Sequence, residues 1–185
     1  MELKVLHSGS KATPWYGGGL KFTCSQCGNC CTGPEGYVWI STTEIHRLAK
    51  HLNTSTDDVI EKYCRRVGNK YSLKERRNSR GEYDCIFLKE IRASRGDGDK
   101  VVYSQRICTI YEFRPLQCRT WPFWEGNLTS PQAWARSAER CHGMNNGSRE
   151  FTKEQIEALR DAKDWPQRPP TSNPTDKPNR KARKS

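Results

Sequence analysis

Three segments of the chain carry apolar residues at helical spacing behind helix start signals. The first two begin near residues 41–44 and 54–58, where hydroxyl and carboxylate side chains suit a helix N-terminus. Their apolar faces comprise Ile45, Leu48, Ala49 and Leu52 in the first, and Val59, Ile60, Tyr63, Cys64 and Val67 in the second. The third begins at Thr152, where Gln155 completes a capping box. The pattern therefore predicts short amphipathic helices, with Cys64 buried in the second as a small hydrophobic residue.

Runs of β-branched and aromatic residues predict strands. These runs lie at residues 37–40, 83–88 and 101–103. Residues 94–99, with the sequence SRGDGD, are typical of a turn, so we expect a β-hairpin around them. Pairing of the two arms would bring Cys85 and Cys108 into one layer of the structure.

The remaining stretches predict one more short helix and irregular chain. Pro115 fits the first turn of a helix that ends before Pro122, and this helix would carry Cys118. We expect irregular structure between residues 124 and 143. The domain organisation follows as an irregular lead-in (residues 1–20), one domain (residues 21–165) and a disordered basic tail (residues 166–185).

The composition indicates a small domain with a limited apolar core. A chain of 185 residues fits one domain, and only 34% of it is hydrophobic, with 14 glycines and 10 prolines. Metal ligation can supply the missing stabilisation, because in small cysteine-rich domains the free energy of metal binding becomes free energy of folding. We expect an α+β fold: a small, irregular, metal-stabilised domain in which a few short helices and a β-hairpin surround a cysteine cluster.

The cysteine cluster lies in residues 22–33, with the sequence FTCSQCGNCCTG. Four of the nine cysteines fall within eight residues: Cys24, Cys27, Cys30 and Cys31. Zinc and iron both favour thiolate ligands, and a two-residue spacer lets consecutive sulfurs turn toward one point. Adjacent side chains point in different directions, so we expect one of Cys30 and Cys31 to serve a second site, a bridging role or neither.

The other ligands are expected among single cysteines further along the chain. The sequence lacks the cysteine-proline pair that ends a bacterial ferredoxin run, and it has no second C-x-x-C of the kind found in zinc ribbons. The candidates are Cys85, Cys108 and Cys118, together with Cys141, whose role the sequence leaves open. Arg114 and Arg119 either offset the thiolate charge or form an ordinary surface pair.

The cysteine content and the absence of long apolar runs indicate the cellular compartment in which the protein is expected. No apolar run reaches the ~18 residues of a membrane span, and residues 1–11 lack the apolar stretch of a secretory signal. We therefore expect a cytoplasmic protein with no membrane partner. Disulfides rarely persist in a reducing compartment, and nine is an odd number of cysteines. The cysteines are therefore expected to be metal ligands, with some left over, rather than a disulfide framework.

The positive charge is unevenly distributed. The formal net charge is +11, residues 65–80 hold seven basic residues against one acidic residue, and residues 166–185 hold six against one. Such segments can attract nucleic acid or an acidic protein. A solvated, charged helix end and strand edge is the simpler explanation of residues 65–80, because no nucleic-acid-binding signature accompanies them.

Three motifs, taken together, resemble a known family. They are the C-x-x-C-x-x-C-C run, the Cys85-Ile-Phe-Leu element and the segment CTIYEFRPLQCRTWPF that begins at Cys108. In this order they resemble the CxxCxxCC family, also called the YkgJ-type cysteine-cluster family, over roughly residues 20–142. The resemblance implies chelation of zinc or iron, often as an iron–sulfur cluster. It implies a metal role for Cys24, Cys27, Cys30, Cys31, Cys85, Cys108 and Cys118, and less firmly for Cys141, whereas Cys64 matches no motif.

Two functions follow from this resemblance. The first is a metal-binding protein that holds an iron–sulfur cluster or zinc, with iron–sulfur slightly preferred. The alternative is an iron–sulfur-dependent protein lysine N-methylase, because some relatives are labelled flagellin lysine N-methylases. The short chain and the absence of a glycine-rich strand-to-helix loop argue against the alternative.

Overall fold

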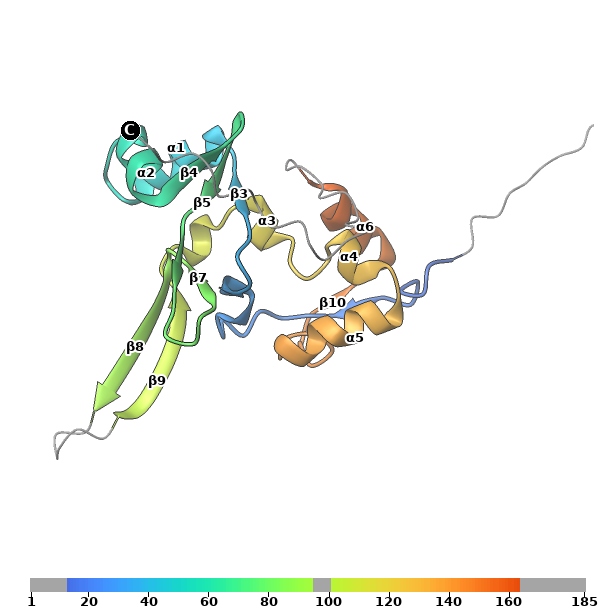
Figure 1. Ribbon diagram of the computed structural model, residues 1–185. Coiled ribbons are helices and arrows are strands. Elements are labelled where there is room, and N and C mark those ends of the chain that lie inside the picture. Colours follow the sequence, from blue (N-terminus) through green and yellow to red (C-terminus); the bar gives the residue numbers. More distant parts are fainter. Residues whose placement is uncertain (1–12, 95–100, 164–185) are drawn as a thin grey trace, which may run out of the picture.

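Two groups of helices and small sheets lie on either side of the cysteine-rich loop in the computed structural model (Figure 1). The structure describes residues 13–94 and 101–163. Most of the expected lead-in, most of the expected hairpin turn and the expected basic tail lie outside the described residues. All strand pairs with a stated register are antiparallel, and the six α-helices of the described part accompany four small sheets. The architecture is therefore α+β, which confirms the predicted fold class.

The first group contains two helices packed against a three-stranded sheet. The helices are α1 (Thr42–His51) and α2 (Thr56–Tyr63), and the sheet has the order β3 (Val38–Ile40), β5 (Lys70–Leu73) and β4 (Cys64–Val67). The capping box between Ser41 and Glu44 is present, as the sequence predicts. Ile45 and Leu48 on the apolar face of α1 are fully buried. The cap and the apolar spacing together explain where α1 begins and which face it buries.

The second helix ends earlier than its apolar pattern predicts. Cys64 follows α2 directly and begins β4, in which it lies opposite Leu73 on β5. Gly68, at φ 60°, allows the chain to turn back between these strands. Cys64 is only 5% exposed and packs in a hydrophobic cluster, so its predicted packing role is confirmed in a strand rather than in a helix.

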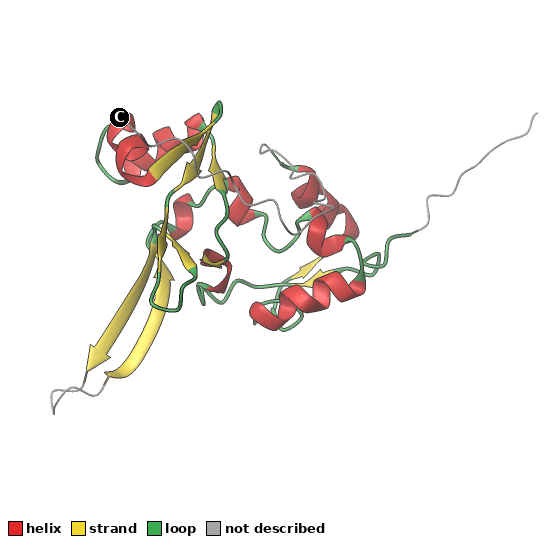
Figure 2. Ribbon diagram, viewed as in Figure 1, coloured by secondary structure: helices red, strands yellow, loops and turns green. Residues whose placement is uncertain are grey.

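A second small sheet and a hairpin lie next to the cysteine loop. The sheet has the order β2 (Thr32–Gly33), β7 (Tyr83–Cys85) and β6 (Glu75–Arg77), and the hairpin consists of β8 (Leu88–Ser94) and β9 (Val101–Cys108). The hairpin is confirmed and extends away from the body (Figures 1 and 2). The predicted pairing was wrong, because the chain turns after β7. Cys85 lies opposite Glu75 on β6, and Leu88 lies opposite Cys108.

The second group contains helices that the sequence pattern partly missed. Its elements are β1 (Leu20–Lys21), α4 (Glu125–Leu128), α5 (Pro131–Arg140), β10 (Glu150–Phe151) and α6 (Lys153–Asp161). The prediction of irregular chain at 124–143 was wrong. Ser130 caps α5, Pro131 occupies its first turn and Trp134 is buried. The capping box of Thr152 and Gln155 at α6 is confirmed.

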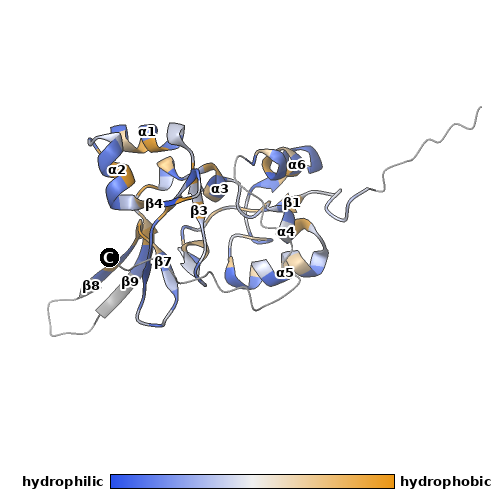
Figure 3. Cartoon of the chain, turned by 45° about the horizontal axis from the view of Figure 1, so that its top comes forward, coloured by the Kyte–Doolittle hydropathy of each residue, from blue (hydrophilic) through white to orange (hydrophobic). Residues whose placement is uncertain are grey.

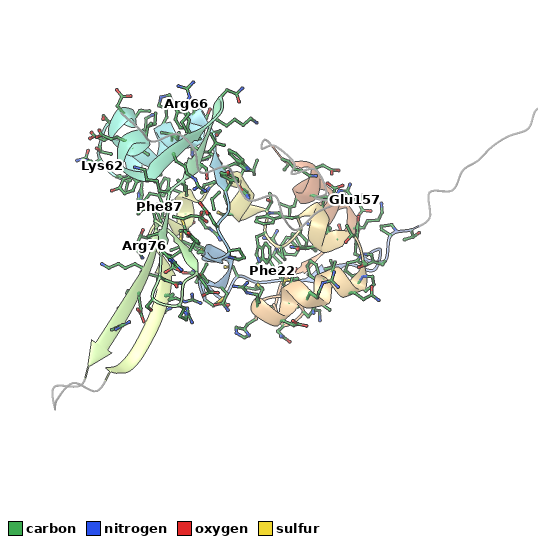
Figure 4. All side chains as sticks on the ribbon, viewed as in Figure 1. Phe22, Lys62, Arg66, Arg76, Phe87 and Glu157 are labelled. Carbon is green, nitrogen blue, oxygen red and sulfur yellow. The ribbon has the colours of Figure 1, made fainter. Side chains whose placement is uncertain are left out.

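In the described part of the chain, two hydrophobic clusters form the interior in place of one large core. Phe87 belongs to the first cluster and Phe22 to the second, and Figure 4 shows them in the two different groups. Figure 3 shows hydrophobic residues in parts of α1 and α2 and at the base of the hairpin, whereas most residues of α6 are hydrophilic. Within residues 13–94 and 101–163, no helix is both long and apolar enough to cross a membrane.

Short elements carry the chain between the two groups. They are the 3₁₀ turns η1 (Asn29–Cys31) and η2 (Tyr111–Phe113) and the one-turn helix α3 (Leu116–Arg119). The short helix after Pro115 is thus present, with Pro115 at the position before its first residue. η1 carries Cys30 and Cys31, α3 carries Cys118, and η2 begins three residues after Cys108.

Candidate metal centre

Eight of the nine cysteines line one cavity of about 50 Å³. They are the eight that the sequence singles out: Cys24, Cys27, Cys30, Cys31, Cys85, Cys108, Cys118 and Cys141. Cys85 belongs to the first hydrophobic cluster and Cys31 and Cys108 pack against it, whereas Cys24 and Cys141 pack against the second. The cavity therefore borders both clusters. Its volume exceeds the ~10–15 Å³ that a cavity needs to hold one water molecule.

The wall of this cavity has the chemistry of a thiolate metal site. All nine cysteines are free, and the rest of the wall is mainly apolar and aromatic, with Arg114 as its charged side chain. In the described part of the chain, no three Cys, His, Asp or Glu side chains converge closely enough to enclose an ion as they stand. The thiols surround a space, and the donor set fits zinc or iron.

The loop from Cys24 to Cys31 owes its path to two residues with positive φ. Gln26 has φ 55° and Gly28 has φ 73°. A Cβ atom at Gly28 would lie 2.8 Å from Cδ1 of Leu88 and 3.1 Å from Cβ of Arg106, so the position also lacks room for a side chain. The loop starts from an anchored segment, because the Phe22 N–H donates to the Arg149 carbonyl over 2.9 Å.

Cys30 and Cys31 lie closer together than adjacent residues in an extended chain would. The 3₁₀ turn η1 carries both, and their Sγ atoms are 3.8 Å apart. Both side chains line the cysteine cavity. The expectation that the two adjacent side chains point in different directions was therefore wrong. Whether each of them binds a metal stays a prediction. Cys30 is the exposed member of the eight, and it also lines two neighbouring cavities of about 180 and 390 Å³.

Cys85 and Cys108 reach the cavity from different sheets. Cys85 ends β7, and the next residue, Ile86, donates its N–H to the Lys74 carbonyl over 3.0 Å. Cys108 ends β9, where the N–H of Thr109 donates to the Phe87 carbonyl over 2.9 Å. These bonds fix the turn after β7 against the base of the hairpin. The two cysteines are therefore brought together by that turn.

Cys118 is positioned by contacts between α3 and the first group. The N–H of Leu116 donates to Oε1 of Glu44 over 2.6 Å, and Oε1 of Gln117 accepts the N–H of Trp39 over 2.7 Å. Helix α3 is thereby joined to α1 and to β3. A one-turn helix has little stability of its own, so these contacts determine where Cys118 lies.

Cys141 lies at the end of α5 and accepts a hydrogen bond. The indole N–H of Trp121 donates to its Sγ over 3.5 Å, and both side chains line the cavity. An N–H donor to sulfur favours the thiolate that a metal requires. His142, the next residue, is exposed and is absent from the cavity wall. Of the Cys-His pair, Cys141 alone reaches the site.

Burial raises the pKa of four of these thiols, those of Cys85, Cys108, Cys118 and Cys141. It raises the pKa of Cys85 to about 11 and that of Cys118 well above its ordinary value, and nearby thiols add to both shifts. Cys30 is different: the hydrogen bond from Cys31 and the charge of Arg114 lower its pKa to about 7, and burial opposes them. The pKa of Cys31 is raised by the same bond. Buried thiols of this kind need a cation before they ionise together.

The two arginines of the sequence prediction have different positions. Arg114 lines the cavity, and its guanidinium lies 3.6 Å from the centre of the Tyr111 ring. Arg119 is exposed and pairs with Glu44 at 3.3 Å. Arg114 therefore faces the thiols, whereas Arg119 joins α3 to α1.

Two aromatic wall residues were not assigned a role by the sequence reasoning. Tyr111 and Trp121 line the cavity, and both lie within the segment that begins at Cys108. Their proximity in sequence to Cys108 and Cys118 was an available signal. Their direction depends on η2 and on the turn after α3, which the pattern of apolar residues does not determine.

Comparison with known proteins identifies the family. The sequence pattern of the CxxCxxCC family, described as "Putative zinc- or iron-chelating domain", matches residues 23–154. This chain belongs to the CxxCxxCC family. All eight cavity cysteines lie within the matched region. The CxxCxxCC description supports metal binding as the general function of the chain.

A relative and a search of structures complete the comparison of this CxxCxxCC protein. An uncharacterized protein of Methanocaldococcus jannaschii is 31% identical over 108 residues, which make up 58% of this chain and 48% of the relative. The chain thus spans about half the length of that relative. No solved structure matches the chain.

Proposed function

We propose that this protein holds an iron–sulfur cluster or zinc in its cysteine cavity, with iron–sulfur preferred. The observation that carries the proposal is the gathering of eight thiols from five separate segments around one cavity. Four thiolates saturate a tetrahedral zinc ion, so eight are more than one such site needs and enough for two. An iron–sulfur cluster is also held by four thiolates, so the eight thiols are enough for two sites of either kind.

The residues of the cavity would have distinct roles toward the bound metal. The eight cysteines are the proposed ligands, with Cys30 on the solvent side because it is exposed. Arg114 would offset part of the thiolate charge, and Trp121 would donate its N–H to the sulfur of Cys141. When bound, the metal would supply stability, or electron transfer if it is an iron–sulfur cluster. A reducing cytoplasm is the compartment in which such thiols remain available.

A matched pair of cysteine variants tests the proposal. Protein purified without oxygen is analysed for iron and zinc and by its visible spectrum, together with Cys118→Ser and Cys64→Ser. Cys118 lines the cavity, whereas Cys64 is buried in the first hydrophobic cluster. The proposal predicts bound metal in the wild type and in Cys64→Ser and a large loss in Cys118→Ser, with all three folded by circular dichroism. Absence of metal from the wild type, or equal loss in the two variants, would overturn it.

A second candidate is an iron–sulfur-dependent protein lysine N-methylase of the flagellin-methylating kind. One observation favours it: the neighbouring cavity of about 180 Å³ combines aromatic side chains with a carboxylate. They are Tyr37, Tyr83, Trp121, Trp124 and Glu75, and the same cavity is lined by four of the cysteines. Aromatic rings and a carboxylate suit a lysine ammonium group. Burial raises the pKa of Glu75, although Arg65 lies 3.1 Å from it.

Co-expression with a flagellin tests this candidate. Mass spectrometry of the flagellin should show methylated lysines with the wild type and fewer with Trp124→Ala, which removes one wall of the aromatic cavity. Arg47→Gln on the exposed side of α1 serves as the control. Unmodified lysines in the presence of metal-loaded wild type would exclude flagellin as a substrate and leave the metal site unaffected.

A further inference from the structure

A larger cavity, lined by arginines, lies on the other side of the cysteine loop. Its volume is about 590 Å³, and four guanidinium groups face it: Arg76, Arg80, Arg92 and Arg106. They come from β6, from the turn after it, and from the two strands of the hairpin. We call this cavity the arginine basin. Figure 4 shows Arg76 next to the base of the hairpin.

The charge of the arginine basin is positive. Two carboxylates, Asp84 and Glu90, also line it and leave a net charge of +2 in the wall. Both have partners: Asp84 accepts a hydrogen bond from Asn78 over 2.9 Å, and Glu90 pairs with Arg92 at 2.7 Å. Arg80 lies 3.6 Å from Glu82, and both side chains are exposed, so that pair is weak. The positive charge is therefore available to an anion.

Two of the arginines are held in place by neutral acceptors. Arg76 donates to the carbonyl of Leu88, and Nη2 of Arg106 donates to Oδ1 of Asn29. The Nη1 atom of Arg106 is buried and has no hydrogen-bond partner in the described part of the chain. Because this atom has almost no exposed surface, an oxyanion in the basin would contact the other N–H groups of Arg106.

The shape and the donors of the arginine basin favour a small phosphorylated molecule. Guanidinium groups match the geometry of phosphate oxygens, and the volume falls within the ~300–1,000 Å³ of small-molecule pockets. A nucleic-acid strand would need a continuous basic track. Of the seven basic residues at 65–80, however, only Arg76 and Arg80 line the basin. Arg65 pairs with Glu75 elsewhere.

We propose that the arginine basin binds the phosphate group of a small phosphorylated molecule. The site lies against the cysteine loop, because Ser25, Gln26 and Cys27 line both the arginine basin and the cysteine cavity. The bound phosphate and the proposed metal would then lie on opposite sides of the same three residues. The phosphate site does not require the metal, so it goes beyond the proposed function.

Titration with inorganic phosphate tests this site. The protein as purified is titrated with inorganic phosphate at constant ionic strength and followed by calorimetry and amide chemical shifts. Saturable binding with one phosphate per chain is expected, with an at least tenfold weaker affinity in Arg76→Gln and Arg106→Gln. Arg47→Gln, which removes the same charge from the exposed side of α1, should retain the wild-type affinity.

The outcomes separate the possibilities. Absence of saturable phosphate binding, or an equal loss in Arg47→Gln, would overturn the proposal. Tighter binding of a short single-stranded RNA, weakened in all three variants alike, would also overturn it in favour of a nucleic-acid surface. Arg106 packs against Gly28, so Arg76→Gln decides the result if Arg106→Gln fails to fold. Metal content measured in the same samples distinguishes loss of the phosphate site from loss of the metal.

Discussion

Gly28 is the residue on which the path of the cysteine loop most depends. Its positive φ and the short distances from its ideal Cβ position to Leu88 and Arg106 are two separate constraints. Gly68 has a similar φ of 60° but nothing within 4 Å of its ideal Cβ position. The two glycines therefore share the conformational requirement and differ in the space around them.

Substitution of Gly28 tests the importance of this space. Gly28→Ala is expected to lower the free energy of unfolding by about 1–3 kcal/mol and to reduce the metal content, because it strains φ and displaces Leu88 or Arg106. Gly68→Ala is expected to cost only the conformational part, about 1 kcal/mol, with unchanged metal content. Denaturant unfolding and elemental analysis measure both. Equal effects of the two substitutions would show that the space around Gly28 is unimportant.

Cys64 provides a pH-dependent contribution to stability that is independent of the metal site. Burial raises the pKa of its thiol from 9.0 to about 11. The folded state therefore holds this proton more tightly than the unfolded state. Its contribution is fully present below pH 9 and is lost as the pH rises through about 11.

Comparison with Cys64→Val isolates this contribution. The free energy of unfolding of the wild type should fall more steeply between pH 9 and about 11 than that of Cys64→Val, which has no thiol to titrate. Tyrosine and lysine titrations occur in both proteins and cancel in the difference. Denaturant unfolding at several pH values measures it. Parallel curves across this range would show that the Cys64 thiol does not titrate differently in the folded state.

At the scale of elements, capping residues were the most predictable feature. The boxes at Ser41 and Thr152 gave the starts of α1 and α6, because a cap is a local interaction between residues close in sequence. The cap of α5 at Ser130 is just as local and was overlooked in a stretch rich in proline and polar residues. Strand pairing was less predictable. The turn after Cys85 depends on a hydrogen bond from the Ile86 N–H to the Lys74 carbonyl, and these two residues are separated in sequence by β6 and β7.

Glu44 joins two of these elements. Its side chain is 10% exposed, accepts the N–H of Ser41 over 3.0 Å and that of Leu116 over 2.6 Å, and pairs with Arg119. The cap of α1 thus also holds the start of α3, which carries Cys118. The sequence predicts the first contact and gives no sign of the second.

Loss of Glu44 should therefore affect α3 as well as α1. Glu44→Ala is expected to lower the free energy of unfolding by about 2–4 kcal/mol, because it leaves the part-buried N–H groups of Ser41 and Leu116, at the starts of α1 and α3, without an acceptor. Hydrogen exchange should become faster at residues 116–119. Glu157→Ala, which removes surface ion pairs of α6, is expected to cost less than about 1 kcal/mol and to leave α3 protected. Unchanged protection of α3 in Glu44→Ala would contradict the proposed connection.

At the scale of the whole molecule, the cysteine cavity lies where two modest hydrophobic clusters meet. The sequence could predict which cysteines line the cavity, because Cys24, Cys85 and Cys118 fall in motifs, whereas Cys64 falls on an apolar pattern. It could not predict that the cavity borders two clusters. That arrangement depends on contacts between residues more than 100 positions apart, such as the hydrogen bond from Nδ2 of Asn29 in the cysteine loop to the Arg140 carbonyl at the end of α5 over 2.9 Å.

Removal of the metal should weaken the connection between the clusters. Treatment with a chelator under reducing conditions is expected to lower the melting temperature and to replace one cooperative transition by two, because each cluster keeps its own packing. Calorimetry measures the transitions, and restored metal should recover the single transition. An unchanged melting profile after complete metal removal would show that the metal does not join the clusters.

The number of sulfur atoms bound to the metal tests the central claim most directly. X-ray absorption at the metal edge, on protein purified without oxygen, reports the identity of the metal and the atoms in its first shell. The account predicts a first shell dominated by sulfur at about 2.3 Å, reduced in Cys118→Ser and unchanged in Cys64→Ser. A first shell of nitrogen and oxygen, or a sulfur count insensitive to Cys118→Ser, would contradict it.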